Sequence, residues 1–131
     1  MPNKDWYYPS SNQEILEYLL IENHFICGVW VDEQLIGFST IYEYTKDNYC
    51  IEDTVVHSNY RGLGLQREMW KYIKTKLMAR NATLWCTIHP SNHYSLNNAY
   101  YLGFKTIEKK VLYNNYERYI LTCELTTYNN T

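Results

Sequence analysis

The sequence predicts an α/β fold of the α+β type, in which a mixed, mostly antiparallel sheet carries helices on both faces. Apolar residues make up 46% and charged residues 20% of the 131 residues, the composition of one globular domain spanning 1–131. Runs rich in β-branched and aromatic residues come in pairs joined by short polar links. A glycine-rich loop between these pairs opens a segment with helical periodicity, which predicts a central parallel β-α-β unit.

The first predicted elements are a helix and three strands. Ser11 and Glu14 form a capping-box pattern, and apolar residues at helical spacing follow, so we expect an amphipathic helix over 12–23. The runs 25–31 and 35–42, joined by a short polar link, predict a hairpin. Residues 49–57 predict a third strand.

The glycine loop at 61–65 opens the second predicted helix, in which apolar residues recur every four positions: Leu65, Met69, Ile73 and Leu77. A short strand is expected over 84–88 and a third helix over 92–101, ended by Gly103 as a C-cap. Strands over 104–112 and 117–125 close the chain, with a tight turn at Asn114-Asn115 between them. The third and fourth strands should pair in parallel, and the terminal hairpins should be antiparallel.

Charge and composition narrow the function classes. The net charge of −2 offers no electrostatic case for binding nucleic acid or an anionic membrane. No apolar run approaches the roughly 20 residues that span a bilayer, and the first residues show no signal segment. The four cysteines are far apart in strand-like runs, so we expect buried, reduced thiols in a cytoplasmic protein without a metal site: Cys27, Cys50, Cys86 and Cys123.

The segment that carries chemistry is the glycine loop between the third strand and its helix. The free N–H groups of a helix's first turn and the helix dipole attract anions, and Gly62 and Gly64 let a ligand approach the backbone. Arg61 adds a charged donor. A nucleoside-triphosphate loop requires Lys-Ser/Thr where Leu65-Gln66 stand, and a dinucleotide fingerprint requires a third glycine. With these two nucleotide sites excluded, the ligand that the loop favours is a pyrophosphate bound by backbone N–H groups.

The segment from His57 to Gln66 resembles motif A of the GNAT family of N-acetyltransferases, whose usual core is Arg/Gln-x-x-Gly-x-Gly/Ala. The late segment Asn92-His93-Tyr94-Ser95, followed by Gly103-Phe104, resembles the family's Asn-x-x-Ala/Ser helix and Gly-Phe pair. Together they cover roughly residues 25–125, in the expected order.

This resemblance implies that acetyl-CoA is the acyl donor, bound where the strand ending at Val56 and the strand of 84–88 splay apart. The pantetheine arm would pair with backbone at Thr54, Val55 and Val56. The pyrophosphate would lie on backbone N–H groups of the loop: Arg61, Gly62, Leu63, Gly64, Leu65 and Gln66. Asn92 and Ser95 would line the cleft. Gln66 replaces the commoner Gly or Ala, so a side chain projects near the phosphates.

Candidate catalytic groups come from the strand that enters the loop. Acyl transfer to an amine needs a neutral amine and a proton source for the leaving thiolate. Glu52 and Asp53 are the candidate bases, and strict alternation would put them on opposite faces. We prefer Glu52, although a structural role is the open alternative. His57 and His89 are expected at the surface or core edge, with proton relay through water as the less favoured role.

The leaving-group acid of the resembled family is a tyrosine on the late helix, at the position of Ala99 here. Tyr100, one residue further, is the tentative acid, but its side chain is turned by about 100° around the helix and would need a local change to take this role. Tyr94 is another possibility, and some members of the family work without such an acid.

The family usually begins with a strand and helix that we do not find in this sequence, so we expect an N-terminally shortened domain. Either a partner chain completes it, as in a homodimer, or the site is open for a large acceptor, or the domain is degenerate. The expected function is N-acetyl transfer from acetyl-CoA to a small primary amine. The alternatives are a non-catalytic acyl-CoA-binding module and an interaction domain with a Tyr-rich surface.

Overall fold

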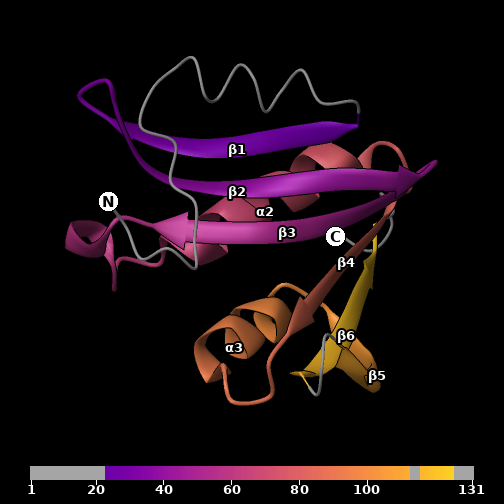
Figure 1. Ribbon diagram of the computed structural model, residues 1–131. Coiled ribbons are helices and arrows are strands. Elements are labelled where there is room, and N and C mark those ends of the chain that lie inside the picture. Colours follow the sequence, from indigo (N-terminus) through magenta and orange to yellow (C-terminus); the bar gives the residue numbers. More distant parts are fainter. Residues whose placement is uncertain (1–22, 113–115, 126–131) are drawn as a thin grey trace.

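The computed structural model describes residues 23–112 and 116–125, which form one six-stranded sheet with two α-helices (Figure 1). The elements in chain order are β1 (His24–Val31), β2 (Gln34–Thr45), β3 (Asn48–Val56), the 3-10 turn η1 (Ser58–Tyr60), α2 (Leu65–Met78), β4 (Thr83–Ile88), α3 (His93–Tyr101), β5 (Lys105–Leu112) and β6 (Tyr116–Glu124). The strand order is β1-β2-β3-β4-β6-β5. The predicted fold class is confirmed. The helix expected over 12–23 and the turn at Asn114-Asn115 lie outside the described residues.

The sheet is antiparallel except at its centre. β1 pairs with β2, β2 with β3, β4 with β6 and β5 with β6 in antiparallel register, whereas β3 and β4 are parallel, as expected for the β-α-β unit. The parallel register covers only Asn48–Cys50 against Thr83–Trp85. Beyond these pairs the two strands diverge (Figure 1). Among the described residues, the β4-facing backbone edge of residues 51–56 therefore has no strand partner.

A β-bulge interrupts β3 close to this divergence. Thr40 of β2 pairs with Asp53, but the next residue, Ile41, pairs with Ile51. Glu52 is the extra residue in β3. A bulge bends a strand and shifts the side-chain alternation beyond it by one position.

The side chains around the bulge show the shifted alternation. Ile51 belongs to the core beneath α2, and Thr54 also faces α2, because its hydroxyl accepts a hydrogen bond from the Trp70 indole. Glu52 and Asp53 lie between them and are both exposed. The prediction that these two acids point to opposite faces was wrong, because strict alternation holds only along an uninterrupted strand.

The helices α2 and α3 pack on one hydrophobic cluster with the central strands. Met69 and Ile73 of α2 are buried in it, as the helical spacing predicted, together with Trp70. Leu96, Ala99 and Leu102 come from α3 and its C-cap. Most of the remaining members come from the central strands: Ile41, Tyr49, Ile51, Leu84, Cys86, Ile88, Leu121 and Cys123. This packing places the first turn of α2 beside α3, on the side where β3 and β4 separate.

The end of α3 and the state of the cysteines were also predicted. Gly103 follows the C-cap with φ +94°, and the Phe104 N–H donates to the Ala99 carbonyl over 3.0 Å, which agrees with the predicted cap. All four cysteines are free thiols, but only two of them are buried, so the prediction of four buried thiols was half wrong: Cys86 and Cys123 are buried, and Cys27 and Cys50 are partly exposed.

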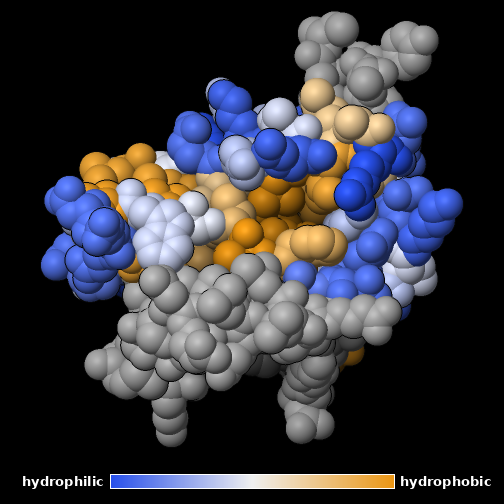
Figure 2. All heavy atoms as spheres, turned by 90° about the horizontal axis from the view of Figure 1, so that it is seen from above, coloured by the Kyte–Doolittle hydropathy of each residue, from blue (hydrophilic) through white to orange (hydrophobic). Residues whose placement is uncertain are grey.

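The surface next to β1 contains an apolar groove of about 300 Å³ between β1 and α2. Phe25 and Ile26 line it from β1, and Tyr72 and Leu77 line it from α2. Seen from above, hydrophobic residues gather in the middle of the described surface and hydrophilic residues border them (Figure 2). Within residues 23–112 and 116–125, neither helix is long and apolar enough to span a bilayer.

Candidate functional site

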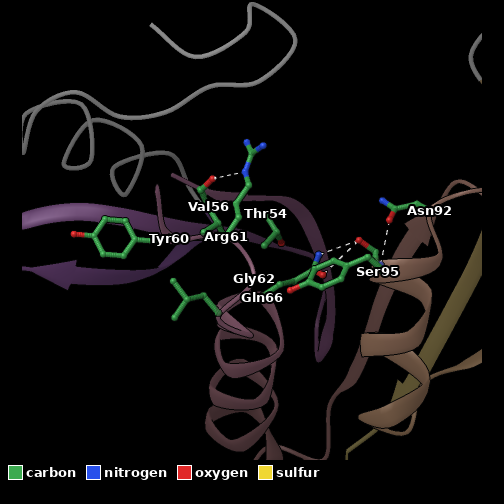
Figure 3. Close-up of a pocket in the computed structure, with 10 residues that line it drawn as sticks. Thr54, Val56, Tyr60, Arg61, Gly62, Gln66, Asn92 and Ser95 are labelled. Carbon is green, nitrogen blue, oxygen red and sulfur yellow. Dashed lines mark hydrogen bonds between the residues drawn. The ribbon is translucent and has the colours of Figure 1, made fainter. Parts of the chain in front are cut away.

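The loop between β3 and α2 is held at its start by two local hydrogen bonds. The Asn59 N–H donates to Nδ1 of His57 over 3.2 Å, which caps the turn η1. The Arg61 side chain turns back, and its Nε donates to the Val56 carbonyl over 3.2 Å (Figure 3). These contacts fix the strand end relative to the residues that enter α2.

At the start of α2 the backbone is not covered by side chains of the loop glycines. Gly64 is its N-cap with φ +76°, and Gly62 has φ +82°, a region that glycine adopts without steric cost. Among the described residues, no side chain caps this helix, and a Cβ atom added at either glycine would meet nothing within 4 Å. The first-turn N–H groups and the positive end of the helix dipole thus face open space, which suits an anion.

A cavity of about 550 Å³ opens beside this loop (Figure 3). Its lining residues are Thr54, Val56, Tyr60, Arg61, Gly62, Leu65, Gln66, Asn92, Tyr94 and Ser95. Most residues that the sequence singled out for the donor site are therefore brought together. Val55 is not among the lining residues, because its side chain packs with Leu35 and Phe38 in a separate cluster. Leu63 is 67% exposed at the tip of the loop.

A second cavity of about 210 Å³ continues from the first between the diverging strands. Both cavities are lined by Thr54, Gln66, Asn92 and Ser95. The other lining residues of the second cavity are Ile51, Glu52, Asp53, Trp70, Cys86, Thr87, Ile88 and Arg118. An elongated ligand can thus reach from the glycine loop, past the four shared residues, to the acids on the bulge.

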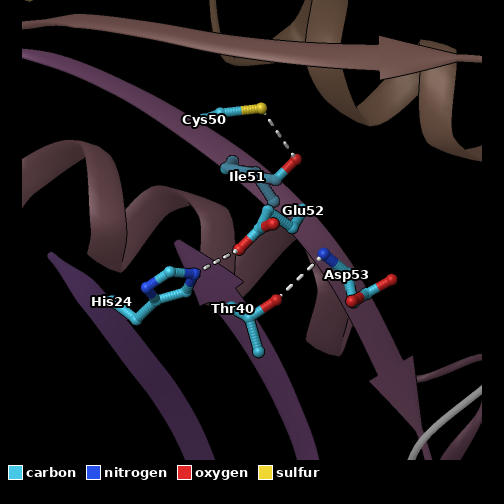
Figure 4. Close-up of polar contacts among 6 residues, drawn as sticks. All are labelled: His24, Thr40, Cys50, Ile51, Glu52 and Asp53. Atoms are coloured by element: carbon cyan, nitrogen blue, oxygen red, sulfur yellow. Dashed lines mark hydrogen bonds and ion pairs between the residues drawn. The ribbon is translucent and has the colours of Figure 1, made fainter. Parts of the chain in front are cut away.

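Glu52, the candidate base, lies at this far end of the second cavity. Its Oε1 is 3.6 Å from Nε2 of His24 on β1, and its side chain is 39% exposed (Figure 4). The neighbouring Asp53 donates its backbone N–H to the Thr40 hydroxyl over 3.1 Å. Sequence reasoning missed His24, because only the register of β1, β2 and β3 brings it near the bulge. Arg118 of β6, which lines the same cavity, carried no local signal either.

The tyrosines of α3 are distributed differently from the expectation. Ala99 is fully buried in the core, so the position resembling the family's acid faces away from solvent. The Tyr100 hydroxyl pairs with the Thr106 hydroxyl of β5 over 2.8 Å, and Tyr100 lines neither cavity. Tyr94, the other tyrosine considered, lines the first cavity near the loop.

The histidines at the strand ends have local structural contacts. Nδ1 of His57 caps η1, and Nδ1 of His89 accepts from the Ser91 N–H over 3.0 Å. The Ser91 hydroxyl also lies 2.7 Å from the same His89 nitrogen. The expectation of histidines at the edge of the core matches these positions.

The cysteines near the cleft are electrically neutral thiols at neutral pH. Burial, with a smaller effect of the Glu52 carboxylate, raises the pKa of Cys50 to about 11. Burial likewise raises the pKa of Cys86, which lines the second cavity. A thiolate nucleophile requires a lowered pKa, so neither cysteine is prepared for covalent catalysis.

These features form a cleft along the open edge of a splayed sheet, with a shape and a helix N-terminus that suit an elongated anionic ligand. Residues 2–104 match the family model described as the acetyltransferase (GNAT) family, and the chain belongs to this family. The match spans the glycine loop and the late helix, which confirms the resemblance of both motifs. Membership assigns acetyl transfer in general, without identifying an acceptor.

Solved structures with the same fold are distant in sequence. The ribosomal-protein-S18-alanine N-acetyltransferase from Escherichia coli has a TM-score of 0.75 at 17% identity, over 92% of this chain and 80% of that one. The IAA acetyltransferase from Bacillus cereus has a TM-score of 0.71 at 14% identity, over 88% and 85%. A GNAT family acetyltransferase from Elizabethkingia anophelis with acetyl-CoA bound has a TM-score of 0.70 at 17% identity, over 88% and 84%. No curated protein sequence matches the chain.

Proposed function

We propose that this protein is an N-acetyltransferase that moves the acetyl group of acetyl-CoA to a primary amine. The observation that carries the proposal is the pair of joined cavities, with bare helix N–H groups at one end and Glu52 at the other. In acetyl-CoA the pyrophosphate and the thioester lie at the two ends of the pantetheine arm, so a donor that extends through both cavities would bring one of these groups to each end.

The described residues fit the pyrophosphate and the pantetheine arm of CoA. The backbone N–H groups from Arg61 to Gln66 would hold the pyrophosphate, since the open space at both glycines admits phosphate oxygens. The free backbone edge at residues 54–56 would pair with the amides of the pantetheine arm, as an added strand does. Asn92 and Ser95, at the start of α3, would contact the arm from the other side of the cavity. The acetyl-CoA complex of a protein with the same fold supports this assignment.

The acceptor amine would enter at the bulge. Its nitrogen attacks the thioester carbonyl, the C–N bond forms, the C–S bond breaks, and the CoA sulfur leaves as a thiolate that takes up a proton. Glu52 would accept the amine's proton, directly or through one water, because it lines the second cavity and remains exposed. The tentative acid Tyr100 would need to leave Thr106 to protonate the thiolate, whereas Tyr94 already lines the donor cavity.

The proposed compartment is argued from the thiols rather than from the fold. Four free cysteines, two of them partly exposed, fit a reducing environment such as the cytoplasm.

The decisive experiment combines binding and turnover. Calorimetric titration with CoA tests donor binding, and incubation with acetyl-CoA and a panel of polyamines, amino acids, aminoglycosides and peptide N-termini tests transfer. Free CoA should be separated by chromatography, because the protein's own thiols would react with a thiol reagent. Absence of CoA binding would refute the proposal. CoA binding without an acetylated product would favour the non-catalytic acyl-CoA-binding module, which the buried Ala99 also favours.

A further inference from the structure

A ladder of polar contacts connects the first turn of α2 to one face of α3. Residues three apart on a helix share a face, and this face of α3 carries Asn92, Ser95, Asn98 and Tyr101. It contacts Gln66 and Arg67 of α2. The contact between Gln66 and Ser95 lies where the two cavities share lining residues (Figure 3). The ladder therefore borders the path proposed for the donor.

The contacts of the ladder are short and largely buried. Nε2 of Gln66 donates to Oγ of Ser95 over 3.1 Å, and Nδ2 of Asn98 donates to Oε1 of Gln66 over 2.7 Å. Nε of Arg67 donates to Oδ1 of Asn98 over 3.0 Å, while its guanidinium lies 3.9 Å from the Tyr101 ring centre. Gln66 is 8% and Asn98 4% exposed. Polar side chains buried in this way are held in one arrangement.

Arg67 sets the direction of the Asn98 and Gln66 side-chain amides. A guanidinium can only donate hydrogen bonds, so Asn98 must turn its oxygen toward Arg67 and its NH₂ group toward Gln66. Gln66 must then turn its oxygen toward Asn98. Its own NH₂ group is thereby directed at Ser95 and at the junction of the cavities.

One donor of Gln66 is left over. A carboxamide nitrogen carries two hydrogens, and one of them is donated to Ser95. Among the described residues, the second has no acceptor. A buried donor without an acceptor costs free energy, and this one lies where any ligand must pass from the first cavity to the second. It is placed to meet a carbonyl oxygen of that ligand.

We propose that Gln66 donates a hydrogen bond to an amide carbonyl of the donor's pantetheine arm, with Arg67 and Asn98 as positioning residues that fix its orientation. This inference rests on the proposed function. The arm is a thin chain that carries its amide carbonyls between the pyrophosphate and the thioester, which is the stretch that crosses the junction. A glycine or alanine, commoner at this place of the motif, has no side-chain donor to offer.

The test compares two ligands that differ only in the arm: CoA, and adenosine 3′-phosphate 5′-diphosphate, which lacks it. Gln66→Met keeps the length of the side chain but cannot donate. Asn98→Asp acts indirectly. The introduced carboxylate would accept hydrogen bonds from both Arg67 and Gln66, so the Gln66 amide would rotate and direct its oxygen, in place of its NH₂ group, toward the arm. Asn97→Ala on the exposed face of α3 is the matched control. Affinities are measured by calorimetry, and folding is checked by circular dichroism and thermal unfolding.

Both variants should bind CoA about tenfold more weakly than the wild type. Their affinity for the armless nucleotide should stay within about twofold, and Asn97→Ala should match the wild type for both ligands. Unchanged CoA affinity in Gln66→Met, or an equal loss for both ligands, would overturn the role of Gln66. A wild-type protein that binds neither ligand would instead refute the proposed function. If Asn98→Asp does not fold, Gln66→Glu replaces it, since a carboxylate also cannot donate.

Discussion

The indole N–H of Trp70 donates to the hydroxyl of Thr54 over 2.9 Å and ties α2 to β3 just beyond the bulge. The same hydroxyl lies 2.9 Å from the hydroxyl of Ser39 on β2. Thr54 is therefore held from the helix and from the neighbouring strand, while its backbone edge remains open to the cleft. These two contacts fix the position of Thr54 on the edge of the cleft.

Replacing Trp70 by Phe should test this contact. The variant keeps most of the buried aromatic surface and removes the donor, so the free energy of unfolding should fall by about 1–3 kcal/mol. Urea denaturation measures the change. Trp85→Phe is the control, because its indole makes a longer contact of 3.3 Å to Asn48 at a partly exposed site and should cost less. An equal loss of unfolding free energy in both variants would contradict a specific contribution of the hydrogen bond from Trp70 to Thr54.

Gly64 tests the placement of the pyrophosphate. Asp and Asn have nearly the same shape and both tolerate the left-handed backbone better than other residues do, so a comparison of Gly64→Asp with Gly64→Asn isolates charge. We expect CoA to bind at least tenfold more weakly to the Asp variant than to the Asn variant, with a difference that shrinks as salt rises. Equal affinities of the two variants at low salt would place the phosphates elsewhere.

Glu52 tests the assignment of the base once an acceptor amine is known. Glu52→Gln should lower the turnover number by about a hundredfold, a typical contribution of general-base catalysis, and leave CoA affinity nearly unchanged. Asp53→Asn is the matched control on the same face of β3, and its turnover should fall by much less. Turnover that is equal in Glu52→Gln and the wild type would remove Glu52 as the base.

Tyr100 and Tyr94 can be separated by removing one hydroxyl at a time. Because Tyr100 bonds Thr106 outside both cavities, Tyr100→Phe should keep its turnover and lose about 1 kcal/mol of stability or less. Tyr94→Phe changes a residue of the donor cavity, so any effect on thiolate protonation should appear there. Steady-state kinetics decides between them, and a large fall in turnover for Tyr100→Phe would restore it as the acid.

Alkaline pH should destabilise the fold through Cys50. Burial raises its pKa from the ordinary 9.0 to about 11, so the folded state keeps a proton that the unfolded state has lost. The resulting stability is complete below about pH 9 and disappears as the pH rises through 11. Urea denaturation from pH 8 to 11 should show a shallower decline for Cys50→Ala, by on the order of 2 kcal/mol. Parallel declines in the two proteins would contradict the raised pKa.

Local patterns in the sequence determined the elements and the donor loop. The glycines at 62 and 64, the periodicity of α2 and the end of α3 at Gly103 each depend on a few neighbouring residues, so each can be interpreted without knowing the fold. The same holds for the pairing of the hairpins and the parallel β3-α2-β4 unit, because short links and a helical crossover leave few arrangements. The family follows from these motifs.

Contacts between segments distant in the sequence decided which side chains meet at the candidate site. The bulge at Glu52 arises from the register of β3 against β2, and it places Glu52 and Asp53 on one face, against the expected alternation. His24 reaches Glu52 only across two other strand pairings, and Gln66 faces Asn98 only because α2 and α3 pack on the same core. A sequence determines the local preferences of a strand or a helix. The partner that each side chain meets depends on register and packing, which the whole sheet settles at once.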